Sequence, residues 1–329
     1  MSRSLVLFKA RLERFFTQRW YAQSPGVLWL LWPLEWIYRA VIWMHLRHLP
    51  EKESVPPCIV VGNITVGGTG KTPFVIALTL WLRGQGLQVG VVSRGYGRTA
   101  RTPVEVSQQT SAEEAGDEPL LIHQASGAIV MVDEDRARAC SALAGRVDVV
   151  VSDDGLQHHA MARSIEIVLV DAERRLGNGH CLPVGPLRQP AARLKSVDYE
   201  VLRASQASSE CAYLRPIGFT RLGDQQQRSI AEMQATSPTI HVVTAIAAPE
   251  RLRSDLEDLG FKVKLRSFAD HHQFSLTDFE GLADNAIVVT GKDSVKLPAE
   301  LSNCWVYQVE MQIPEPVLQS LWTQLKELL

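Results

Sequence analysis

The sequence predicts an α/β fold in which helices cover both faces of a mostly parallel sheet, followed by a smaller α/β C-terminal lobe. Short runs rich in β-branched residues alternate with helical patterns from residue 58 onward, an order typical of parallel sheets that are buried on both faces. The chain of 329 residues is long enough for one large domain or two ordinary ones. Its apolar content of 46% and charged content of 21% are ordinary for a folded protein.

The elements follow from these runs in chain order. In the first part, strands are expected at Cys58–Gly62, Val89–Ser93, Ala128–Val132, Val147–Ser152 and Ile165–Val170, with a helix at Pro73–Arg83. Residues 205–238 are richer in Ser, Gln and Arg and less periodic, so we place a connection between lobes there. In the second part, strands are expected at His241–Ile246, Phe261–Phe268, Ala286–Thr290 and Trp305–Val309, with helices at Pro249–Leu259 and Pro316–Leu329. The predicted parts are residues 1–50, 51–204 and 205–329.

The N-terminal part differs from the rest of the chain. Residues 1–20 carry five basic residues and one acid, and five of the eight tryptophans lie within residues 20–43. Pro33, Glu35 and Arg39 interrupt the apolar run, which falls short of the about 20 apolar residues of a clean spanning helix. Tryptophan favours the headgroup level of a membrane and basic residues favour anionic lipid. We therefore expect a helix in the membrane interface; a single span and an ordinary helix packed on the body are the alternatives.

Composition argues against several other classes of protein. The formal net charge of −2 gives no general attraction to nucleic acid. The five cysteines are scattered without a C-x-x-C pair, so we expect reduced thiols rather than disulfides or a zinc site. The N-terminus has no small-residue cleavage site, so a removed signal peptide is not expected. No feature indicates an obligatory protein partner.

The segment TVGGTGKT follows the first expected strand and opens the first expected helix. This is the context of a phosphate-binding P-loop, although its first position is threonine rather than glycine. The glycines let backbone N–H groups approach phosphate oxygens, Lys71 reaches the β- and γ-phosphates of ATP, and the Thr72 hydroxyl binds Mg²⁺. The alternative is a glycine-rich turn that happens to precede Lys-Thr. The expected nucleotide-binding residues are Thr65, Val66, Gly67, Gly68, Thr69, Gly70, Lys71 and Thr72.

Two acids, Asp153 and Asp154, end the strand expected at Val147–Ser152. Carboxylates at the carboxyl end of a parallel strand face the ligand crevice of such sheets. One of them can hold Mg²⁺ or its water, as the second-strand Asp of P-loop enzymes does. The alternative is a pair of acids that cap the following turn. The sequence leaves open which of the two binds the metal.

Several segments together carry a resemblance to a known family. They are, in order, VGNITVGGTGKTP (61–73), SRGY (93–96), GDEP (116–119), DDGLQH (153–158), LPVGPLR (182–188), DHH (270–272) and TGKD (290–293). In this order they resemble the tetraacyldisaccharide 4'-kinase family, the lipid A 4'-kinases, and the aromatic N-terminus fits that family too. One departure is Gly291, where the family pattern leads us to expect an acidic residue.

The resemblance implies a P-loop kinase with ATP and Mg²⁺. It implies transfer of the γ-phosphate to the 4'-hydroxyl of a tetraacylated glucosamine disaccharide 1-phosphate, a lipid A precursor, giving lipid IVA. The glycolipid and the membrane surface would be its partners, at the cytoplasmic face of the inner membrane of a Gram-negative-type bacterium. It also implies two lobes joined by a hinge.

Site residues outside the loop follow from chemistry and from the resemblance together. Asp117 is the expected base for the acceptor hydroxyl, with His271 orienting or sharing its proton. Taken alone, Asp117 also fits a helix cap before Glu118–Gln124, and His271 an ordinary loop histidine. Arg94 is expected to counter phosphate charge, and a surface salt bridge is its alternative. Gln157 joins the metal set, and the expected substrate contacts are Asn63, His158, Arg136 and Arg188.

Two other classes fit the P-loop alone. One is an enzyme for a small soluble acceptor, such as a carboxylating synthetase or a metallochaperone GTPase, but the aromatic, basic N-terminus argues against it. The other is a membrane-recruited nucleotide switch of the partitioning type, which typically has a second lysine near the start of its loop. Here position 66 is valine, and no lysine lies between Ser54 and Gly70. The dipeptide Lys292-Asp293 lacks the spacing of the guanine-reading [NT]-K-x-D motif.

Overall fold

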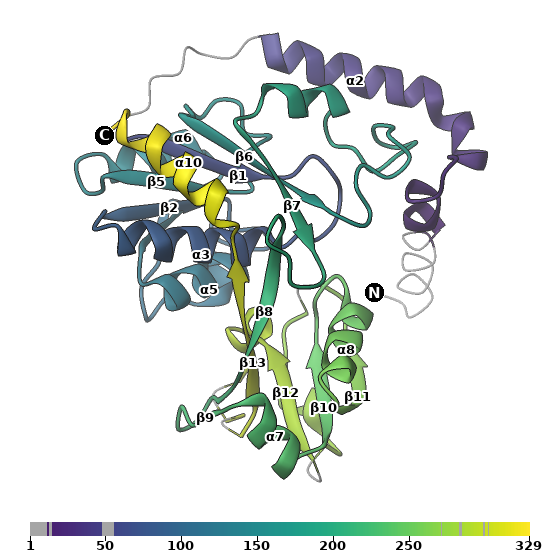
Figure 1. Ribbon diagram of the computed structural model, residues 1–329, viewed down its shortest axis with the longest axis vertical. Coiled ribbons are helices and arrows are strands. Elements are labelled where there is room, and N and C mark those ends of the chain that lie inside the picture. The colour runs from purple at the N-terminus through teal and green to yellow at the C-terminus, as the bar shows by residue number, and fades with distance from the viewer. Residues whose placement is uncertain are drawn as a thin grey trace.

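The computed structural model describes residues 12, 15–47, 56–270, 272–282, 285–298, 300–301 and 303–329. In this part of the chain the strands form one 13-stranded sheet that two lobes share (Figure 1). The mostly parallel sheet predicted for the first lobe is confirmed. Its strands are, in spatial order, β6 (Ile165–Asp171), β1 (Cys58–Gly62), β5 (Val149–Asp153), β2 (Val89–Ser93) and β4 (Ile129–Val132), with β3 (Val104–Glu105) antiparallel at the edge.

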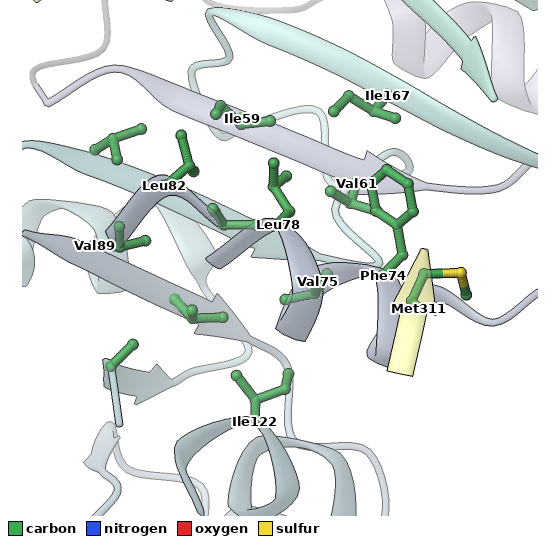
Figure 2. Packing of buried hydrophobic residues seen from close by; sticks show 14 of the residues in the cluster. Ile59, Val61, Phe74, Val75, Leu78, Leu82, Val89, Ile122, Ile167 and Met311 are labelled. Atoms are coloured by element: carbon green, nitrogen blue, oxygen red, sulfur yellow. The ribbon is translucent and has the colours of Figure 1, made fainter. Parts of the chain in front are cut away.

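Helix α3 (Lys71–Gly84) covers one face of this sheet (Figure 2). Its side chains Phe74, Leu78 and Leu82 recur every four residues, so they share one face of the helix, and all three are fully buried. They belong to the same core cluster as Ile59 and Val61 of β1. Burying each such side chain contributes about 1.5–3 kcal/mol. This packing fixes the beginning of α3 beside the end of β1.

Other helices complete both layers. Helix α5 (Asp117–Ser126), which follows the short α4 (Ala112–Ala115), adds Ile122 to the core under α3. The C-terminal helix α10 (Glu315–Lys326) returns to the first lobe and adds Leu321 to the same cluster. Helix α6 (Arg136–Leu143) packs in the cluster on the opposite face of the sheet.

Two long strands join the lobes. After β7 (Tyr199–Ala204), which extends the parallel sheet beside β6, strand β8 (Ala212–Arg221) leaves the first lobe and pairs antiparallel with β13 (Trp305–Gln312). Figure 1 shows these two strands crossing from one lobe to the other. The stretch 205–238, where we place the connection between lobes, contains β8, β9 (Gln227–Arg228) and α7 (Ile230–Thr236). Strand β8 contains Pro216 and Gly218, which interrupt the residue pattern expected of a strand.

The second lobe has its own core. Strands β10 (Thr239–Thr244), β11 (Lys262–Ser267) and β12 (Ala286–Thr290) run parallel beside β13, and helix α8 (Pro249–Asp258) packs against β11. Inside this lobe the ring of Phe219 contacts those of Phe261 and Tyr307, and each of the two centroid distances is 5.5 Å. Short helices complete the described fold at η2 (Ala191–Ser196), η3 (Leu276–Phe279) and α9 (Gly291–Ser294).

The N-terminal helices η1 (Gly26–Leu31) and α2 (Trp32–Arg47) run along the outside of the first lobe (Figure 1). By length and composition, Gly26–His45 is one helix of 20 residues that is apolar enough to cross a membrane, with 11% of its window buried. It is thus more apolar than its interruptions at Pro33, Glu35 and Arg39 lead us to expect. Its exposed apolar side chains are Val27, Trp29, Leu30, Trp32, Leu34, Trp36, Ile37, Val41, Trp43 and Met44.

Polar contacts dock α2 on the first lobe. Glu35 is 1% exposed, and it accepts hydrogen bonds from the backbone N–H of Cys181 at 2.9 Å and lies 2.9 Å from Nδ1 of His180. The hydroxyl of Tyr38 donates to the carbonyl of Arg188 at 3.0 Å. One side of the helix is therefore held by protein, and the aromatic side chains are left outside.

Candidate functional site

The loop between β1 and α3 has the backbone of an anion-binding site. Gly70 precedes α3 with φ 82° and Gly67 has φ 112°, values that favour glycine because a Cβ would be strained there. The N–H groups at the start of α3 have no partners within the helix and point toward the loop, as phosphate binding requires. Thr69 Oγ1 is buried without a hydrogen-bond partner in the described structure.

Lys71 lies at the mouth of this loop. Its ammonium donates to Oδ1 of Asn63 at 3.2 Å and lies 3.5 Å from Oδ1 of Asp154. Asn63 is fully buried, and its amide donates to the carbonyl of Thr65 at 2.9 Å. The structure therefore places Asn63 beneath the loop, where it supports both the loop backbone and Lys71.

The two acids after β5 have different environments. Asp153 is 2% exposed, and its Oδ1 has no hydrogen-bond partner in the described structure. Burial, together with the charges of Glu118 and Asp154, raises the pKa of Asp153 to about 7. Burial also acts to raise the pKa of Asp154, but Lys71, Arg188 and other cations outweigh it and lower that pKa overall. A buried carboxylate oxygen without a partner fits a position beside a cation.

The predicted substrate-contact residues Arg136 and Arg188 meet at Asp154. Arg136 donates from Nη1 to the carbonyl of Asp154 at 2.8 Å, and burial lowers its pKa. Arg188 Nη1 lies 3.3 Å from Oδ2 of Asp154 and 3.5 Å from Oε1 of Gln157. Gln157 in turn donates to the carbonyl of Asn63 at 2.8 Å. Two guanidinium groups thus border the mouth of the loop, as an anionic ligand needs.

His158 and Arg94 lie at the edge of this group. The Nε2 of His158 is 3.8 Å from Asp135, and burial, with Arg136 nearby, lowers the pKa of His158. Both effects favour the neutral form of its imidazole. Arg94 follows β2 and is exposed, and its charge also acts to lower the pKa of both Arg136 and His158. Among the described residues, no salt bridge holds Arg94.

Asp117 begins α5, whose next residue, Glu118, is close enough to Asp153 for its charge to raise the pKa of that carboxyl. Asp117 is 4% exposed, and its Oδ2 lies 3.2 Å from the ammonium of Lys296. The helix expected at Glu118–Gln124 is present, but Gly116 with φ 90° takes the N-cap position, and no side chain caps the helix. His271 lies outside the described residues, so the pairing of Asp117 with His271 stays a prediction.

The segment 182–188 supports the P-loop, a role that was not predicted from the sequence beyond the substrate contact expected of Arg188. In the motif LPVGPLR, the carbonyl of Pro186 accepts from the N–H of Val66 at 2.8 Å, and the N–H of Arg188 donates to the carbonyl of Ile64 at 2.7 Å. The hydroxyl of Tyr21 donates to the carbonyl of Val66 at 3.3 Å. The motif therefore lies alongside the P-loop and supports it. Its presence among the family-like segments was the available signal.

Comparison with known proteins identifies the family. The family model of Tetraacyldisaccharide-1-P 4'-kinase matches residues 27–326. This chain belongs to that family. A tetraacyldisaccharide 4'-kinase of Pseudomonas putida is 42% identical over 308 residues, covering 90% of this chain and 91% of the relative. One of Idiomarina loihiensis is 38% identical over 322 residues, covering 94% and 97%.

A solved structure agrees with the fold. The crystal structure of LpxK from Aquifex aeolicus in complex with ATP has a TM-score of 0.74 and 26% sequence identity, and the alignment covers 91% of this chain and 99% of that one. The predicted family, α/β fold and phosphotransferase class are confirmed. Relatives of this chain come from Gram-negative bacteria, and the chain is an ATP-binding kinase of lipid A biosynthesis.

The environment of Asp153 leads to a prediction about magnesium. Asp153→Asn removes the buried carboxylate whose Oδ1 has no hydrogen-bond partner among the described residues. We therefore expect half-maximal activity to require at least about tenfold more Mg²⁺, the scale of a weakened metal site. Activity is measured over a Mg²⁺ titration at saturating ATP. Asp224→Asn, in an exposed turn of the second lobe, is the matched control. A lower rate with an unchanged Mg²⁺ midpoint would remove Asp153 from the metal set.

Proposed function

We propose that this chain transfers the γ-phosphate of ATP to the 4'-hydroxyl of a tetraacylated glucosamine disaccharide 1-phosphate at the cytoplasmic face of the inner membrane. The observation that carries the proposal is that the start of α5 lies within electrostatic reach of the acids beside the loop, since the charge of Glu118 acts on Asp153. Lys71 stands at the mouth of a phosphate-binding loop, and Asp117 is buried at the start of α5. Membership of the 4'-kinase family supports the same acceptor.

The residues present fit ATP and magnesium. Loop 65–72 offers backbone N–H groups and the Lys71 ammonium to phosphate oxygens. The donors for the metal are the Thr72 hydroxyl, Asp153 or Asp154, and Gln157, an all-oxygen set of the kind Mg²⁺ prefers. Mg²⁺ supplies neutralisation of phosphate charge. This assignment is supported by the buried Oδ1 of Asp153, which has no hydrogen-bond partner among the described residues.

The acceptor side rests on Asp117 and the arginines. Asp117 accepts the proton of the 4'-hydroxyl as the oxygen attacks phosphorus, with His271 sharing or orienting that proton. Arg94 balances charge on the transferred phosphoryl group. Arg136, Arg188, His158 and Asn63 are proposed contacts of the anionic glycolipid, with Asn63 acting from beneath the loop through Lys71.

The lobes and the N-terminal helix complete the proposal. We place the hinge in β8 and β13, because they are the strands that cross between the lobes. The helix from Gly26 to His45 lies in the membrane interface, with its tryptophans in the headgroup layer. Docking through Glu35 and Tyr38 holds its other side on the lobe. The glycolipid thereby reaches the site without leaving the bilayer.

A glycolipid-dependence assay tests this function against the rival classes. Detergent-solubilised protein is expected to consume ATP when the tetraacyldisaccharide 1-phosphate is added with Mg²⁺, and to lose that activity when either is left out. Consumption at the same rate without the glycolipid would favour a nucleotide switch. Consumption with a small soluble acceptor alone would favour the other rival.

The exposed tryptophans lead to a prediction about membrane binding. Trp32→Glu with Trp36→Glu places charge on the outer face of α2, where these side chains are 46% and 56% exposed. We expect at least about tenfold weaker binding to anionic phospholipid vesicles, since about 1.4 kcal/mol is a factor of ten and inserted aromatic side chains contribute more than that together. Binding is measured by co-sedimentation, with ATP affinity unchanged.

The control for this prediction is Ile217→Glu, which places a negative charge on an exposed position of strand β8, away from α2. These substitutions are cleaner than deleting residues 1–45, because Trp20 and Tyr21 donate hydrogen bonds to Pro183 and Val66. Carbonate washing distinguishes an interfacial helix from a membrane-spanning helix, since it extracts the former from the membrane and leaves the latter in place. Vesicle binding unchanged by the double substitution would support a helix that merely packs on the body.

A further inference from the structure

Two lysines of the second lobe contact the helix that carries Asp117. Lys292 lies in α9, and Lys296 follows it. The ammonium of Lys296 is 3.2 Å from Oδ2 of Asp117, and that of Lys292 is 3.2 Å from Oε1 of Glu118. Asp117 and Glu118 are the first two residues of α5 in the first lobe. The two lobes therefore meet through charged pairs directly at the proposed base.

The charge on Lys296 is buried. Its side chain is 0% exposed, and that of Asp117 is 5% exposed. A buried ammonium is costly unless carboxylates accompany it, and its second carboxylate is Asp293, 3.6 Å away. In the described structure Nζ makes no well-aligned hydrogen bond to either partner. Lys296 and Asp117 therefore form an ion pair without a well-aligned hydrogen bond.

Asp293 is already satisfied by its own lobe. It accepts hydrogen bonds from the hydroxyls of Thr244 at 2.6 Å and Thr290 at 2.7 Å, and from the N–H of Ala245 at 3.1 Å. These donors fix Asp293 between β10 and β12, where it anchors Lys296. The remaining carboxylate partner of Lys296 is Asp117, on the other lobe. The arrangement directs a fixed positive charge from the second lobe at the proposed base.

Lys292 makes a second charged contact between the lobes, with Glu118. Burial alone would lower the pKa of Lys292, but Glu118 and Asp270, the latter 3.5 Å away, outweigh burial and raise it. A Cβ added at Gly291 would lie 3.3 Å from Cδ1 of Leu121, so α9 approaches α5 closely. The glycine that departs from the family pattern thus sits where the two lobes touch.

We infer that Lys296 is a positioning residue for phosphoryl transfer, which orients the Asp117 carboxylate and keeps it ionised for the acceptor hydroxyl. This inference rests on the proposed role of Asp117 as the base. A cation about 3 Å from a carboxylate favours its charged form, typically by 1–3 pH units. Among the described residues, the charged groups placed near Asp117 include Lys296, 3.2 Å away, Lys292, whose pKa Asp117 helps to raise, and the adjacent Glu118. Lys296 is the nearest cation among them.

The test is Lys296→Met, which removes the charge and keeps an unbranched apolar chain. We expect kcat to fall about 10- to 100-fold, below the roughly 10²–10⁴ of losing a general base. The KM for ATP should stay within about twofold, because the P-loop is untouched. The acidic limb of the kcat–pH profile should move to higher pH by about one unit or more. In the Asp117→Asn background, Lys296→Met should cost less than about twofold further.

Matched variants separate positioning from simple clamping of the lobes. Lys292→Met removes the neighbouring contact between the lobes, and because Lys292 interacts with Asp117 more weakly than Lys296 does, it should move the acidic limb by less than Lys296→Met. Lys262→Met, on exposed strand β11, controls for loss of a lysine. If Lys296→Met does not fold, Lys296→Arg and the charge-balanced Asp117→Asn/Lys296→Met pair carry the test. Lys296→Arg should retain the acidic limb of the wild type.

An unmoved acidic limb in a folded Lys296→Met protein would overturn the inference, as would multiplicative losses in the Asp117→Asn background. Failure of the underlying proposal looks different. Wild-type protein without glycolipid-dependent activity would refute the proposed function itself. A fully active Asp117→Asn protein would refute the base, and with it the role of Lys296.

Discussion

Lys71→Ala is expected to reduce kcat by at least ~10³, the scale of removing a charge partner of the transferring phosphoryl group. The structure gives the reason. The Lys71 ammonium is held by Asn63 and Asp154 at the mouth of the loop, so phosphate meets a cation that is already in place. A factor of 10³ corresponds to about 4 kcal/mol of transition-state stabilisation. The rate is measured at saturating ATP and glycolipid.

The fold should survive this change, because the Lys71 side chain is outside the apolar core and is 14% exposed. A thermal unfolding curve checks this. Lys262→Ala, on β11 of the second lobe, is the matched control and should keep the wild-type rate. A folded Lys71→Ala protein with more than about a tenth of the wild-type rate would mean that the loop does not bind the transferred phosphate.

Asp117→Asn is the second large effect. An amide cannot accept the proton of the hydroxyl, so we expect kcat to fall by roughly 10²–10⁴ with little change in ATP affinity. His271→Ala should act on the same step. If the two residues work as a unit, the double variant is barely worse than the poorer single variant. Rates and nucleotide affinities are measured for all four proteins.

The dyad also predicts an acidic limb in the pH–rate profile, where the pair takes up a proton. That limb belongs to the pair rather than to one residue, because coupled groups titrate jointly. Independent, multiplicative losses in the Asp117/His271 double variant would contradict a dyad. So would a nucleotide-bound structure in which the two side chains lie on opposite sides of the γ-phosphate.

The local features of the nucleotide lobe could be predicted from sequence. Strand Cys58–Gly62 has the bounds that its continuous apolar run predicts, because a strand buried on both faces leaves an unbroken signal. The glycines and Lys71 of the loop lie within a few residues of one another, so their chemistry is visible without a fold. The positions of Asp153 and Asp154 at the end of β5 follow from the strand itself.

Features that depend on distant segments could not be predicted in this way. Strand β8 owes its structure to pairing with β13, about 90 residues later, and Pro216 and Gly218 within it obscure the strand pattern of its own sequence. The role of Asn63 as a substrate contact stays a prediction, and only the folded chain shows that its side chain also accepts a hydrogen bond from Lys71. Lys296 and Asp117 lie far apart in the sequence and in different lobes, and only the folded chain brings them to 3.2 Å.

Identification of the phosphorylated product tests the central claim most directly. Purified protein is incubated with Mg²⁺, ATP labelled in the γ-phosphate and the tetraacyldisaccharide 1-phosphate, and the product is examined by mass spectrometry and phosphorus NMR. The account predicts one added phosphate, located on the 4'-oxygen, and no product from an acceptor that lacks the 4'-hydroxyl. A labelled phosphate at any other position, or ATP hydrolysis to free phosphate with the glycolipid unchanged, would contradict it.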